Sequence, residues 1–235
     1  VLTAILIFSL PLWKKRSEVK TGEVSGESDG TANDETRKPL GVRGVLAIRG
    51  AKEILVMFFC YCALEQTAML WASSYMALGK GIDKTTAAMW GSLFCIGITV
   101  GRLASGFLTM RLSDPSMIRL GQALVLTGVI IMLLPLPHHI GTIAGLMVIG
   151  LGCAPIYPCV IHSTPTYFGK DKSQAIVGMQ MAFAYVGSMC MPPLFGLIAQ
   201  HVSVNLFPFY LVVFLVLMVA MHETLRRKCG DRAAA

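Results

Sequence analysis

The chain has 235 residues and a formal net charge of +7, and it is 54% hydrophobic but only 14% charged. Soluble domains carry about 25% charged residues. The apolar residues also come in runs of about 20, the length at which a helix crosses the roughly 30 Å hydrocarbon core of a membrane. Composition and patterning thus exclude an ordinary soluble domain and predict an all-α protein with several membrane spans.

The first segment of the chain is apolar and short. Residues 1–13 end at Lys14-Lys15-Arg16, and a helix of about 13 residues rises only about 20 Å. A signal peptide would carry its positive charges before the apolar part rather than after it. We therefore expect residues 1–13 to be the end of a truncated transmembrane helix, and the chain to be the C-terminal portion of a longer protein.

A polar segment follows. Residues 14–40 are rich in Gly, Ser and Glu and contain almost no large apolar residues, which is typical of a disordered linker. Residues 41–49 combine apolar residues with cations, so either a short helix on an anionic lipid surface or the ordinary end of a linker fits them. We predict a cytoplasmic linker loop over residues 14–50.

The rest of the chain contains six long apolar runs. Their lengths predict membrane spans at about 53–78, 85–110, 117–137, 140–167, 174–200 and 204–222. These spans form a predicted six-helix bundle over residues 51–222, and residues 223–235 form a tail.

The cations are distributed unevenly between the two ends of these spans. If the segments alternate across the membrane, nearly all of the 20 Lys and Arg residues fall on the side of the 14–50 loop and the tail. Positive charge marks the cytoplasmic side, so we expect the loop and the C-terminus in the cytoplasm of a plasma-membrane protein. Because these cations flank spans instead of lining a groove with aromatic residues, we expect no nucleic-acid partner.

Glu65 lies near the middle of the first span, where a carboxylate costs roughly 2.5 kcal/mol or more. At helical spacing it shares one face with Tyr61 and Tyr75. Aromatic rings beside a carboxylate suit a sugar, and the carboxyl group can also take up and release a proton during a transport cycle. The alternative is a protonated Glu65 that packs by a hydrogen bond to a neighbouring helix.

Three further residues are candidates for substrate binding or proton coupling. Arg102, about two turns from the cytoplasmic end of its span, either approaches Glu65 or extends to the interface. His162 follows Pro155 and Pro158, which predict an interrupted helix; it relays protons, binds a hydroxyl, or caps carbonyls freed by proline. Gln180 is a weaker candidate for a cavity.

The order of the spans contains a pattern. The runs at 123–136 and 204–222 are apolar all round, which is typical of peripheral, lipid-facing helices. The third span of each triplet is thus predicted to be peripheral, and the charged or proline-containing spans are predicted to be central. Two three-helix repeats of inverted topology fit this order and are typical of secondary transporters. Gly97 and Gly101 predict close helix packing beside Arg102.

The segment Gly101-Arg102-Leu-Ala-Ser-Gly106-Phe-Leu-Thr-Met-Arg111-Leu-Ser-Asp114 resembles the second copy of the loop motif of the major facilitator superfamily. Met110 stands where that motif has Asp, Ser113 where it has Gly, and Asp114 where it has Arg. The resemblance implies a gating loop that includes Gly106, Arg111 and Asp114.

Two other stretches narrow the resemblance. Leu64-Glu65 with Trp71, and Ala154-Pro-Ile-Tyr-Pro158, are similar to the fucose-permease-like sugar/proton symporters of that superfamily. The resemblance implies a twelve-helix transporter whose helices seven to twelve lie in this chain, with an N-terminal six-helix half as the missing partner. It also implies symport of a small, sugar-like solute with H⁺ by alternating access.

The same sequence features fit other functions. A proton-coupled drug or metabolite exporter, working by antiport, would use the same fold, and a non-transporting receptor fits as well because fold does not fix function. We expect no enzyme, since neither H-E-x-x-H nor G-x-S-x-G occurs. The seven cysteines contain no Cys-x-x-Cys, so we expect no disulfide, metal site or cofactor.

Overall fold

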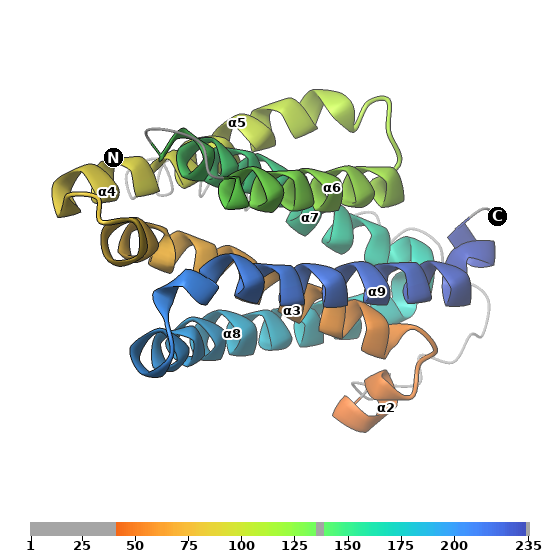
Figure 1. The fold of residues 1–235 in the computed structure, drawn as a ribbon. Helices are drawn as coiled ribbons and strands as arrows, with labels where there is room; N and C mark the ends of the chain where they lie inside the picture. Colours follow the sequence, from red (N-terminus) through yellow and green to blue (C-terminus); the bar gives the residue numbers. More distant parts are fainter. Residues whose placement is uncertain (1–40, 135–138, 234–235) are drawn as a thin grey trace, which may run out of the picture. The chain divides into compact units, whose positions relative to one another are not determined.

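The computed structural model describes residues 41–134 and 139–233. The truncated helix predicted over residues 1–13 and most of the linker predicted over residues 14–50 lie outside the described residues. Within the described residues every regular element is a helix or helical turn, so the all-α prediction is confirmed. Figure 1 shows the elements, whose bounds are α2 (Val42–Leu46), α3 (Ala51–Ser74), η1 (Tyr75–Gly79), α4 (Lys84–Gly91), α5 (Leu93–Leu108), α6 (Asp114–Leu133), α7 (Ile140–Phe168), α8 (Lys170–His201), η3 (Val204–Leu206) and α9 (Phe207–Ala233).

Six helical segments in the described residues are long and apolar enough to cross a membrane, and they match the six predicted spans. They are Ala51–Gly79, Lys84–Leu108, Asp114–Leu133, Ile140–Phe168, Asp171–His201 and Val204–Cys229. The last helix continues through the predicted tail to Ala233. The predicted six-helix bundle is thereby confirmed.

The helices pack in a reciprocal way. α3 packs mainly against α8 and α9, whereas α7 packs mainly against α5 and α6. The two groups form the lower and upper layers of the bundle in Figure 1. The first helix of each triplet therefore contacts the second and third helices of the other triplet. A two-fold relation between two three-helix repeats produces this exchange, so the packing supports the predicted inverted repeats.

The prediction that prolines interrupt the helices is wrong. Pro155, Pro158 and Pro165 lie inside the continuous helix α7, and Pro192 and Pro193 lie inside α8. A proline removes one N–H from the helical ladder, but packing by neighbouring helices preserves the helix around it.

The glycines of α5 allow its backbone to approach α7 closely. A Cβ atom built on Gly101 would lie 2.7 Å from the carbonyl oxygen of Leu151, which has lost its helical donor at Pro155. A Cβ on Gly97 would collide with the carbonyl oxygen of Met147. The predicted close packing at Gly97 and Gly101 is therefore confirmed, and it brings α5 directly against α7.

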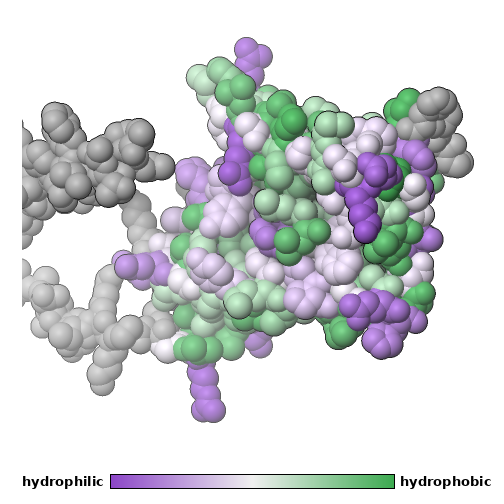
Figure 2. Space-filling model, turned by 90° about the vertical axis from the view of Figure 1, so that its left-hand side faces the viewer, coloured by the Kyte–Doolittle hydropathy of each residue, from purple (hydrophilic) through white to green (hydrophobic). Residues whose placement is uncertain are grey.

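The third and sixth spans were predicted to be peripheral, but they are not the most exposed spans of the bundle. In this bundle α5 and α8 expose more of their surface than α6 and α9 do. Leu103 and Phe107 on α5, and Tyr185 and Met189 on α8, are among the exposed large side chains. An even apolar pattern along one helix therefore does not determine how much of that helix the bundle leaves exposed. Figure 2 shows apolar and polar residues intermingled on the end that carries the start of α4.

Candidate functional site

Glu65 is half-buried on α3, one of the two innermost helices of the bundle. Tyr61 lies one helical turn before it and is 1% exposed. The Tyr61 hydroxyl group lies close enough to the Glu65 carboxyl group to interact with it. The structure therefore places these two predicted residues together, as their spacing on a helix indicated.

Arg102 approaches the same carboxylate from α5. Its guanidinium is close enough to attract the charge of Glu65. No ion pair within contact distance joins the two side chains in the part of the chain that the structure describes, and Arg102 is exposed. The close packing of Gly101 against Leu151 holds α5 near α7 at this level. The guanidinium of Arg102 and the carboxyl group of Glu65 thus interact across two helices without direct contact.

Tyr157 on α7 joins this group. Its ring centroid lies 6.2 Å from that of Tyr61 and 5.1 Å from that of Phe58. Its hydroxyl group donates to the sulfur of Met181 on α8 at 3.3 Å. The candidate site is therefore built by side chains of α3, α5, α7 and α8.

The contact of Tyr157 with Tyr61 was not predicted from the sequence. Tyr157 and His162 lie in the same proline-rich stretch, now part of α7. Tyr157 lies beside Tyr61 because of the height along the bundle at which α7 crosses α3. No sequence signal specifies that height. The sequence signal that could have identified Tyr157 is its position as an aromatic residue between Pro155 and Pro158 in a predicted span.

Tyr75 does not join the group, although it was predicted on the Glu65 face. It follows Glu65 by ten residues, about 15 Å along a helix. Its buried ring lies 5.0 Å from that of Phe207, with the Lys80 ammonium 5.6 Å from its centroid. The π-helical turn η1 begins at this residue. Tyr75 thus packs near the far end of the helix.

Gln180 is engaged with another polar residue. It is fully buried between α7 and α8, where its side-chain nitrogen donates to the Thr164 hydroxyl at 3.2 Å. This pairing satisfies two polar groups inside the bundle. The proposed substrate site therefore does not include Gln180.

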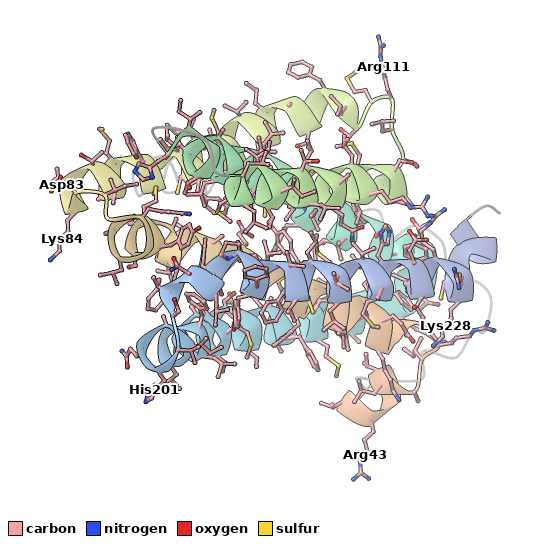
Figure 3. The ribbon with its side chains drawn as sticks, in the orientation of Figure 1. Arg43, Asp83, Lys84, Arg111, His201 and Lys228 are labelled. Atoms are coloured by element: carbon pink, nitrogen blue, oxygen red, sulfur yellow. The ribbon has the colours of Figure 1, made fainter. Side chains whose placement is uncertain are left out.

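His162 pairs with a residue of the predicted gating loop. Its Nδ1 lies 2.6 Å from a carboxylate oxygen of Asp114, the first residue of α6. The other two loop residues, Gly106 and Arg111, are exposed. Figure 3 shows Arg111 extending away from the connection between α5 and α6. His162, a candidate for proton coupling, and Asp114, a candidate for the gating loop, thus form one side-chain pair that joins α6 to α7.

The His162–Asp114 pair is expected to contribute less than about 1 kcal/mol to the free energy of unfolding, because the His162 side chain is 81% exposed. A double-mutant cycle with His162→Gln and Asp114→Asn, followed by thermal unfolding in detergent, measures this coupling. The Arg119–Glu223 pair, with two hydrogen bonds of 2.8 Å, serves as the comparison. A coupling for His162–Asp114 well above that of the comparison pair would contradict this expectation.

The fold and the site together define a multi-pass α-helical membrane protein with a charged and aromatic site inside one six-helix bundle. The sequence model of the Major Facilitator Superfamily matches residues 54–227, and the chain belongs to that family.

Individual relatives are distant. The chain is 25% identical over 169 residues to an uncharacterized MFS-type transporter of Yersinia pestis. The aligned region covers 71% of this chain and 43% of that protein. Its fold is similar to that of the major facilitator transporter FucP in the outward conformation, with a TM-score of 0.63 and 16% identity over 86% of this chain and 49% of that one. A variant of the E. coli fucose:proton symporter FucP gives a TM-score of 0.62 with 16% identity, covering 86% of this chain and 50% of that one. The chain thus spans about half the length of the proteins it matches.

Proposed function

We propose that this chain is one half of a secondary active transporter that moves a small polar, sugar-like solute together with H⁺. The observation that carries the proposal is Glu65, a half-buried carboxyl group in the middle of a membrane-spanning helix, one helical turn from the buried Tyr61 and within electrostatic range of Arg102. Ionisable residues at this depth are costly and usually serve binding, ion coupling or proton transfer.

The side chains around Glu65 fit a polyhydroxylated solute. The rings of Tyr61 and Tyr157 offer flat apolar faces for the C–H side of a sugar. The Glu65 carboxylate accepts hydrogen bonds from hydroxyl groups, and the Arg102 guanidinium donates to oxygen atoms. The fucose:proton symporter, which has a similar fold, gives this substrate class additional support.

Proton coupling is assigned to Glu65. A carboxyl group is neutral with a proton and negative without one, so its attraction to Arg102 changes as the proton binds and leaves. A solute that inserts between the two side chains competes for Arg102 and makes the protonated carboxyl group the better partner. Solute and proton then bind together, which is the requirement for symport.

A second six-helix half completes the proposed transporter. The exposed apolar side chains of α5 and α8, such as Phe107 and Met189, are proposed to face that half. Rocking of the two halves around the midplane would expose Glu65 alternately to the two sides. The proposed orientation in the plasma membrane puts the C-terminus, Arg111 and the His162–Asp114 pair at the cytoplasmic side, where the pair joins the gate.

Proteoliposomes that contain the complete protein and an internal pH-sensitive dye test the proposal. Added external sugar is expected to acidify the lumen, because solute and proton enter together. Lumenal alkalinisation by solute entry would identify antiport and favour the drug or metabolite exporter. Solute entry without proton movement, under a range of external solutes, would contradict coupled transport.

A further inference from the structure

Five exposed cationic residues gather at one end of the bundle. They belong to the segment around α2, the first turn of α3 and the last turns of α9. We name this set the basic edge, and its members are Arg43, Arg49, Lys52, Arg227 and Lys228. Figure 3 shows Arg43 and Lys228 at the end opposite to Asp83, Lys84 and His201.

Charge at the basic edge is only partly compensated. Glu53, whose side chain is 12% exposed, forms an ion pair with Lys228. Glu53 therefore compensates one of the five cations, Lys228, and leaves the other four. The outer surface therefore remains strongly positive.

The segment that carries Arg43 and Arg49 is fixed in place. Gly50 connects it to α3 in a left-handed conformation with φ of 91°, and a Cβ atom there would lie 2.6 Å from the sulfur of Cys229. The Cys229 thiol also donates to the carbonyl oxygen of Arg49 at 3.6 Å. Val45, 1% exposed, anchors α2 on the bundle. These contacts tie both arginines to the end of α9.

The depth of the basic edge matches the surface of a lipid bilayer. The apolar spans of α3 and α9 begin at Ala51 and end at Cys229, and four of the five cations lie within two residues of these limits. Val42 lies 64% exposed on the same segment, beside Arg43. An apolar side chain among cations at this level is typical of a segment that contacts the lipid interface.

From this arrangement we propose that the basic edge binds the phosphate-bearing headgroups of anionic phospholipids. Cations close to an anionic leaflet attract its lipids, and the attraction falls off within a Debye length. Here five such charges are held together by the fold, so they can engage one or two headgroups at once. This inference rests only on the bundle spanning a membrane, and it holds whether or not the transported solute is a sugar.

The test compares the association of spin-labelled phosphatidylglycerol and phosphatidylcholine with the protein in phosphatidylcholine vesicles. The wild-type protein is expected to prefer phosphatidylglycerol, and high salt is expected to weaken the preference. The Arg43→Gln/Arg49→Gln variant is expected to lose at least a factor of about five in this preference, since each cation near the surface contributes roughly that much. Arg43→Lys/Arg49→Lys keeps both charges and is expected to retain the preference.

The matched control removes two cations from the opposite end, as Lys80→Gln/Lys84→Gln, and is expected to leave the preference unchanged. Thermal unfolding in detergent verifies that each variant is folded. An unchanged preference in Arg43→Gln/Arg49→Gln, or an equal loss in the control, would overturn the proposal.

Discussion

Replacement of Glu65 by glutamine is expected to abolish proton-driven accumulation of the solute. Glutamine keeps the size and the hydrogen-bonding capacity of the side chain, but it cannot bind and release a proton. The amide oxygen of glutamine can accept a hydrogen bond from the neighbouring Tyr61 hydroxyl group, so the local packing is preserved. Accumulation against a gradient should fall to the level of protein-free vesicles, whereas exchange of labelled for unlabelled solute should continue. Uptake and exchange of radiolabelled solute in proteoliposomes measure the two activities.

Glu53→Gln is the matched control on the same helix. Glu53 lies in the first turn of α3 in an ion pair with Lys228, and it has no place in the proposed transport site. It is expected to leave accumulation intact. If exchange is lost together with accumulation in Glu65→Gln, the carboxylate also binds the solute. Unchanged accumulation in Glu65→Gln would refute its role as the proton carrier.

Replacement of Gly97 by leucine is expected to destabilise the bundle by about 3 kcal/mol, the upper end of the usual cost of overpacking. A side chain there collides with the backbone carbonyl of Met147 on α7. Because the obstacle is backbone and not a flexible side chain, α5 and α7 must move apart. That separation also displaces Arg102 from Glu65. Equilibrium unfolding in mixed detergent measures the change in free energy.

Gly178→Leu controls for the loss of a glycine from a helix. No atom lies within 4 Å of a Cβ built on Gly178 in α8, and leucine is the better helix former. Its stability should equal or exceed that of the wild type. Equal stability of Gly97→Leu and Gly178→Leu would contradict the close contact between α5 and α7.

The spans and the family were predictable because both depend on local sequence. The length of an apolar run is set by the thickness of the hydrocarbon core, so each of the six spans can be identified by itself. The contact between Tyr61 and Glu65 follows from the pitch of a single helix. The loop motif from Gly101 to Asp114 is also one continuous segment, and it pointed to the family that the match over residues 54–227 shows.

The remainder of the candidate site depends on how far one helix is shifted along another. Tyr157 meets Tyr61, and His162 meets Asp114, because α7 crosses α3 and α6 at particular levels. Hydropathy constrains those levels to within a few residues, which is too coarse to pair side chains. Tyr75 illustrates the same limit, since it shares a helical face with Glu65 but lies about 15 Å along the axis.

Proton uptake on solute binding tests the central claim, that Glu65 links the solute to the proton, most directly. Isothermal titration of the purified protein with its solute, in two buffers of different ionisation enthalpy, gives the number of protons taken up per solute bound. The wild-type protein is predicted to take up protons as the solute binds, and Glu65→Gln is predicted to bind the solute without proton uptake. Equal proton uptake by both proteins, or none by the wild type, would contradict the account.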